Sequence, residues 1–159
     1  MKVTKRPAAG TLLIVLQALL GIGAVYGGGA LMLDPTGELV GMPSDMMEIP
    51  LFPNYLIPGI ILLLMFGILP LVVAAGLVRK REWTWGNKLN LFKNMHWSWA
   101  FSLYIGFALV IWISVQVYIL NGSSVVHLLY TAWGLAIQIL TLLPSVGGFY
   151  AKTARGQES

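Results

Sequence analysis

Long apolar runs alternate with short polar connections along this chain, and the alternation occurs four times. The runs cover residues 11–33, 55–78, 97–120 and 125–146, and each contains between 22 and 24 residues. About 20 consecutive apolar residues are enough to cross a bilayer as a helix. The pattern therefore predicts an all-α fold, an integral membrane four-helix bundle that forms one membrane domain over residues 1–159.

Charged residues are sorted by sign between the polar connections. Lys and Arg occur before the first run, between the second and third runs and after the fourth run, whereas the connections 34–54 and 121–124 contain neither. Positively charged residues favour the cytoplasmic side of a membrane. We therefore expect both termini and the loop between the second and third helices to be cytoplasmic, and the basic residues to contact anionic lipid head groups.

The composition excludes several classes of protein. Only 10% of the 159 residues are charged and the mean hydropathy is +0.78, whereas soluble domains contain about 25% charged residues. The net charge of +4 does not indicate nucleic-acid binding, because the basic residues flank the apolar runs. The chain has no cysteine, which excludes thiol-redox chemistry and thiolate metal sites. No cofactor is expected.

The first extracytoplasmic connection is too apolar for a solvated linker. Residues 34–59 read DPTGELVGMPSDMMEIPLFPNYLIPG and contain five prolines, which prevent a long helix. Ser44 is suited to cap a short helical turn over residues 45–47. We predict an ordered, proline-rich cap over the outer mouth of the bundle, between the first and second helices.

Acidic residues of this cap and one histidine form a weak candidate for a metal site. Asp34, Glu38, Asp45 and Glu48 lie in the cap, and His127 lies near the start of the fourth run. Carboxylates and imidazole can bind divalent cations. However, the spacing matches no metal motif, and we favour the simpler account that these are solvated acids that keep the outer face free of positive charge.

The polar residues inside the four runs are all uncharged. Ion-coupled transporters usually carry an ionisable residue within the membrane, and none of the runs contains Asp, Glu, Lys or Arg. Glutamine in lipid normally hydrogen-bonds to a neighbouring helix. We predict intramembrane polar contacts at Gln17, Ser102, Gln116 and Gln138. We expect Gln17 and Gln138 to face the interior, and at least one of them to bond across a helix interface.

Two features of the helices predict how they pack and bend. Gly23 and Gly27, like Ala24 and Gly28, are four residues apart, a spacing that suits close packing within the bundle and also occurs in helix dimers. Pro70 lies deep in the second run and cannot bond to the carbonyl of Phe66. We therefore expect the second helix to bend there.

Parts of the sequence resemble a known group of proteins. The stretches D34-P-T-G, G41-M-P-S and I49-P-L-F-P-N-Y-L-I-P-G59, together with W112-I-S-V-Q116, resemble an uncharacterised group of small four-helix bacterial membrane proteins. The resemblance covers about a third of the chain. It implies the same topology and a prokaryotic cell membrane, and it carries no activity and no catalytic residue.

Three functions agree with these observations. The leading hypothesis is a non-enzymatic structural or accessory protein that binds another membrane protein or a second copy of itself. A small-molecule or lipid transporter or channel is the first alternative, and a continuous polar cavity across the midplane would favour it. A membrane enzyme or cation-binding protein that uses the outer carboxylates is the second alternative.

Overall fold

The structure, a computed structural model, describes residues 5–42 and 51–152. In this part of the chain every secondary-structure element is a helix, and the only β-type pairing is an isolated bridge between Met95 and Ala151. In chain order the elements are α1 (Ala8–Leu33), the 3-10 turn η1 (Glu38–Val40), α2 (Leu56–Ile61), the π-helix η3 (Leu62–Ile68), α3 (Leu69–Arg79), α4 (Thr84–Leu89), α5 (Trp97–Ile119), α6 (Val125–Leu142) and α7 (Pro144–Tyr150).

Four helices are long and apolar enough to cross a membrane, as the apolar runs predict. They are α1, the continuous helix of α2, η3 and α3 (Leu56–Arg79, here called the second span), α5 and α6. The fourth helix differs from expectation, because α6 ends at Leu142 rather than at residue 146. Pro144 has no N–H to continue the helix, and it begins the separate helix α7 instead.

The second span contains a π-helix immediately before Pro70. The N–H of Leu69 bonds to the carbonyl of Leu64, five residues back, and π geometry covers Leu62–Ile68. Such wide turns are rare and occur mostly as single-turn bulges inside α-helices. The departure from α geometry therefore precedes the proline. The expected bend at Pro70 stays a prediction.

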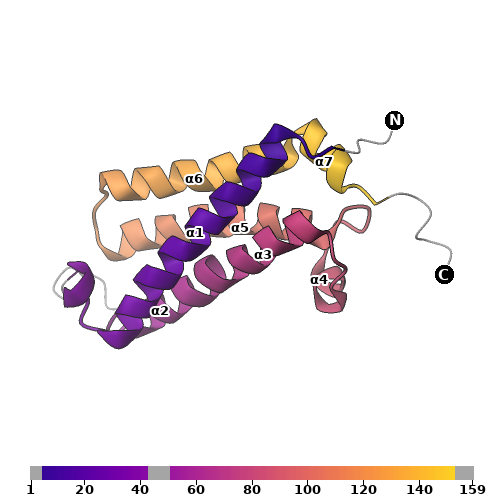
Figure 1. Cartoon of the computed structure of the whole chain (residues 1–159). Coiled ribbons are helices and arrows are strands. Elements are labelled where there is room, and N and C mark those ends of the chain that lie inside the picture. The colour runs from indigo at the N-terminus through magenta and orange to yellow at the C-terminus, as the bar shows by residue number, and fades with distance from the viewer. Residues whose placement is uncertain (1–4, 43–50, 153–159) are drawn as a thin grey trace.

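The helices are arranged as two pairs (Figure 1). α5 and α6 form an antiparallel hairpin, and α1 lies against the second span along its length. α1 also runs obliquely across the bundle, from α7 at one end to α2 at the other. The end that carries Arg6, Lys80 and Lys152 is called the basic end, and the end that carries Asp34 and Glu38 is called the acidic end.

Glycines bring α1 and the second span into backbone contact. A Cβ added at Gly28 would lie 2.6 Å from the nitrogen of Leu63 and 2.8 Å from the carbonyl oxygen of Gly59, and one at Gly21 would lie 2.9 Å from the carbonyl oxygen of Gly67. The close approach therefore uses Gly28, as expected. Gly23 does not take part, because a Cβ there would meet nothing within 4 Å.

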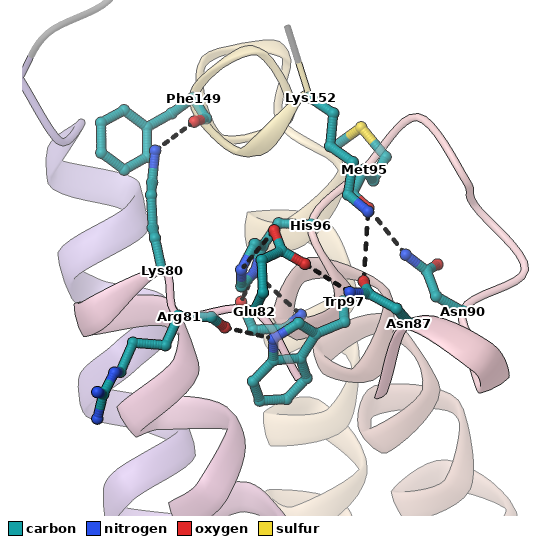
Figure 2. Close-up of polar contacts among 11 residues, drawn as sticks. Lys80, Arg81, Glu82, Asn87, Asn90, Met95, His96, Trp97, Phe149 and Lys152 are labelled. Atoms are coloured by element: carbon teal, nitrogen blue, oxygen red, sulfur yellow. Dashed lines mark hydrogen bonds and ion pairs between the residues drawn. The ribbon is translucent and has the colours of Figure 1, made fainter. Parts of the chain in front are cut away.

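Basic side chains hold the helix ends together at the basic end. Nη2 of Arg6 donates to the carbonyl of Val78 at 2.8 Å, and the hydroxyl of Tyr150 donates to the carbonyl of Leu77 at 2.8 Å. Nζ of Lys80 donates to the carbonyl of Phe149 at 2.7 Å and lies 3.4 Å from the centre of its ring (Figure 2). These donors satisfy carbonyls that helix C-termini leave unpaired.

A buried histidine lies at the same basic end. His96 precedes α5, and its Nδ1 accepts from the N–H of Ser98 at 3.3 Å, so the neutral ring carries its proton on Nε2. That nitrogen is 4.0 Å from Oε1 of Glu82 (Figure 2) and has no hydrogen-bond partner among the described residues. Burial lowers the pKa of His96, while the Glu82 carboxylate acts in the opposite direction.

Candidate functional site: a cavity in the acidic half

In the described part of the connection that follows α1, the carboxylate of Asp34 orders the backbone. The carboxylate of Asp34 accepts from Oγ1 of Thr36 at 2.6 Å and from the N–H of Leu39 at 2.8 Å. The hydrogen bond from Thr36, followed by that from Leu39, lowers the pKa of Asp34. Asp34 thus fixes the turn that leads into η1.

The predicted cation site does not assemble from the residues that the structure describes. Within 5–42 and 51–152, no three His, Asp or Glu side chains come close enough together to hold a metal ion. His127 belongs to the capping box of α6, where its Nδ1 accepts from the N–H of Ser124 at 3.1 Å. Asp45 and Glu48, like Ser44, lie outside the described residues.

The glutamines and Ser102 agree with the predicted polar contacts only in part. Gln17 is fully buried, as expected, yet neither atom of its amide has a described hydrogen-bond partner. Ser102 donates to the carbonyl of Ser98 on its own helix. The predicted bond across an interface is therefore wrong for Gln17, and Gln138 makes none with another described residue either. The stem of Gln138 instead packs against Gly106, 2.7 Å from where a Cβ would lie.

Tryptophans make the cross-helix hydrogen bonds that were expected of the glutamines. The indole N–H of Trp99 on α5 donates to the carbonyl of Thr141 on α6 at 2.7 Å. That of Trp133 on α6 donates to the carbonyl of Leu16 on α1 at 3.3 Å. The available sequence signal was a tryptophan within an apolar run, because a buried indole N–H usually finds an acceptor.

A cavity of about 770 Å³, open to the surface of the protein, occupies the acidic half of the bundle. Its walls come from α1, η3, α5, α6 and the α5–α6 connection. A smaller cavity of about 130 Å³ adjoins it and is bounded by Val40, Met42, Phe52 and Tyr55 from the loop side. The two cavities share part of their lining, including Gly27, Leu62, Trp112 and Gln116.

Small residues on α1 leave the space open. Gly23, Ala24 and Gly27 line the larger cavity, and a side chain at Gly23 would project into open space. α1 packs on α2 at this end, so it does not cover the first turns of α6, where Leu128 is 69% exposed. The cavity therefore lies between α1 and α6, where the two helices diverge.

The cavity does not continue into the basic half. Leu20, Phe66 and Leu109 line its deeper part. Closer to the basic end, Leu13, Gln17, Ser102 and Ile137 have no exposed surface. Close packing of these side chains separates the cavity from the basic end.

Two polar side chains of α5 lie at the junction of the two cavities. Trp112 and Gln116 are four residues apart, so they share one face of the helix. The indole nitrogen of Trp112 is buried without a described partner, and the ring packs on Phe66 with a centroid distance of 6.3 Å. The side chain of Gln116 makes no hydrogen bond with another described residue. Gln116 is thus the predicted polar residue that the structure places in a cavity.

The volume and lining are typical of a site that binds a small apolar molecule. Ligand pockets span about 300 to 1,000 Å³ and combine apolar walls with a few polar groups. The polar residues described in this lining are Trp112, Gln116, Ser123, Ser124, His127 and Tyr130. Comparisons with protein-family models, curated proteins and solved structures found no match.

Proposed function

We propose that this chain is a non-enzymatic accessory protein of the cell membrane that holds a lipid-soluble molecule in the outer half of the bilayer. The cavity between α1 and α6 supports this proposal. The charge pattern supports the orientation, with both termini in the cytoplasm and the acidic end outside. In this orientation the larger cavity opens towards the outer face, where Val40 and Met42 contribute to its lining, and Phe52 lines the smaller cavity beside it.

Binding of another membrane protein or of a second copy is the second candidate. The start of α6 favours it, because Val125, Leu128 and Leu129 are 72%, 69% and 60% exposed. Lipid covers such a face as readily as a protein does, since lipid tails are as apolar as leucine. The cavity is the more specific feature, so ligand binding is the preferred function. A transport path would have to pass the packed side chains of the basic half.

Filling the cavity tests the proposal. Gly23→Trp places an indole in the cavity, whereas Gly29→Trp adds the same ring to α1 at a position that is also free of contacts and does not line the cavity. Binding of a phosphatidylcholine with a fluorescent acyl chain is measured on each purified protein in detergent. We expect at least tenfold weaker binding in Gly23→Trp and unchanged binding in Gly29→Trp. Equal binding by all three proteins would contradict the proposal.

A further inference from the structure

The side chain of Gln116 identifies the chemistry of the ligand. An amide in an apolar cavity has one acceptor and two donor positions, and leaving them unpaired in a hydrocarbon environment is unfavourable. Gln17, whose amide also has no described partner, is fully buried and enclosed by protein, whereas Gln116 is only partly buried. Gln116 lines both cavities, so a bound molecule can supply its partner.

The depth of Gln116 matches one part of a lipid. It lies three residues before the end of α5 at Ile119, or about 5 Å along the helix axis at 1.5 Å per residue. The polar interfacial layer of a bilayer is about 5 to 7 Å thick on each side. With its 23 residues α5 is about 35 Å long, slightly longer than the hydrocarbon core of about 30 Å. An α5 centred on that core places Gln116 close to the boundary between hydrocarbon and head groups, where the ester carbonyls of glycerolipids lie.

The charges around the cavity argue against recognition of the head group. The connections 34–54 and 121–124 contain no Lys or Arg, so they provide no cation for a phosphate. The hydroxyls of Ser123 and Ser124 are neutral, and Asp34 and Glu38 at the same end are acidic. The lining therefore discriminates by its apolar surface and by hydrogen bonds to neutral oxygen atoms.

We propose that the cavity binds an ester-linked glycerolipid, with one acyl chain in the larger cavity and an ester carbonyl oxygen accepting a hydrogen bond from the amide of Gln116. This inference rests on the proposed function, since it specifies the ligand of the same cavity. The ring of Trp112, one helical turn deeper than Gln116, forms the wall beside the first part of the acyl chain.

Lipids that differ only in their ester groups test this inference. A diacyl phosphatidylcholine and its dialkyl ether analogue, with equal chain lengths, compete against the fluorescent phosphatidylcholine for the purified wild-type protein. The ether analogue lacks the carbonyl oxygen. We expect the diester to compete about fivefold better, the effect of one net hydrogen bond. Equal competition would overturn the inference, and this comparison needs no variant.

Two variants test whether the preference for the diester lipid depends on the amide of Gln116. Gln116→Leu removes the amide and keeps a similar volume. For this variant the two lipids should compete equally, because the diester loses affinity. Gln138→Leu is the matched control, since Gln138 does not line the cavity, and it should keep the wild-type preference. A Gln116→Leu protein that still prefers the diester would also overturn the inference.

The outcomes separate the two proposals. If both lipids compete equally and Gly23→Trp still weakens binding, the cavity binds lipid and only the assignment of the ester fails. If Gly23→Trp binds as well as wild type, the proposed function itself fails.

Discussion

Gly23 and Gly28 are five residues apart on one helix and have opposite surroundings. A Cβ at Gly28 would lie within 3.0 Å of the backbone of Leu63 and Gly59, while one at Gly23 would meet only open space. We expect Gly28→Ala to lower the free energy of unfolding by about 1 to 3 kcal/mol through overpacking, and Gly23→Ala to be neutral. Unfolding by a denaturing detergent measures both variants, and equal stabilities would contradict the packing of α1 on the second span.

A substitution at Gln17 should raise the free energy of unfolding rather than lower it. Its amide is fully buried, with both polar atoms unpaired among the described residues. A buried polar group without a partner costs about 1 to 3 kcal/mol. Gln17→Leu, which has a similar shape, should therefore stabilise the protein by this order.

Trp133→Phe is the control for Gln17→Leu. It removes the bond from the indole N–H to the carbonyl of Leu16 and should destabilise the protein by about 1 kcal/mol. Thermal unfolding in a mild detergent reports both changes. A destabilised Gln17→Leu protein would contradict the unpaired state of this amide.

At the scale of elements, the contribution of the helix contacts at the basic end to the free energy of unfolding should fall in acid. Burial lowers the pKa of His96 below its ordinary value of 6.5. Below pH 6.5 the unfolded chain therefore binds a proton that the folded chain does not, and stability falls as the pH drops from 6.5 towards the folded pKa. Above pH 6.5 both states are neutral, and the contribution of this histidine is constant.

The thermal midpoint measured at pH 7.5 and at pH 5.5 checks this prediction. His96→Gln removes the titrating ring, so its midpoint should depend less on pH than that of the wild type. Gln138→Leu, which changes no titratable group, is the control and should behave as the wild type does. An equal dependence on pH in all three proteins would exclude His96 as the cause.

The sequence predicts the elements better than it predicts their contacts. The length of each apolar run is enough to locate the four spans, because a bilayer sets that length. It does not reveal which face of α1 packs on the second span, since Gly21, Gly23, Gly27 and Gly28 are alike as residues. Only the structure shows that Gly21 and Gly28 face the second span, while Gly23 and Gly27 line the cavity.

For the candidate site, residue type identifies Gln116 as polar within a span and no more. Gln17, Gln116 and Gln138 satisfy the same sequence criterion. One is enclosed in the core, one lines a cavity and one packs its stem on Gly106. The distinction depends on the open space beside Gly23 and Gly27, which residue types along a single helix do not show.

At the scale of the whole molecule, the orientation in the membrane can be measured directly. The chain has no cysteine, so single cysteines at Glu38 and Lys88, both exposed, report their sides independently. A membrane-impermeant thiol reagent added to intact cells should label Glu38→Cys and not Lys88→Cys. Permeabilised cells, in which both should react, provide the control. The reverse labelling pattern would invert the proposed topology.

The pairing of the helices has a mechanical consequence. α1 and the second span form one unit, and α5 with α6 forms the other. The hydrogen bonds from Tyr150 to Leu77 and from Lys80 to Phe149 join the second span to α7, which follows α6, at the basic end. The cavity separates α1 from α6 at the acidic end. The two pairs of helices are thus joined at the basic end and diverge at the acidic end, so a change in the angle between them would change the width of the cavity. We therefore expect lateral pressure in the leaflet around the acidic end to change the volume of the cavity.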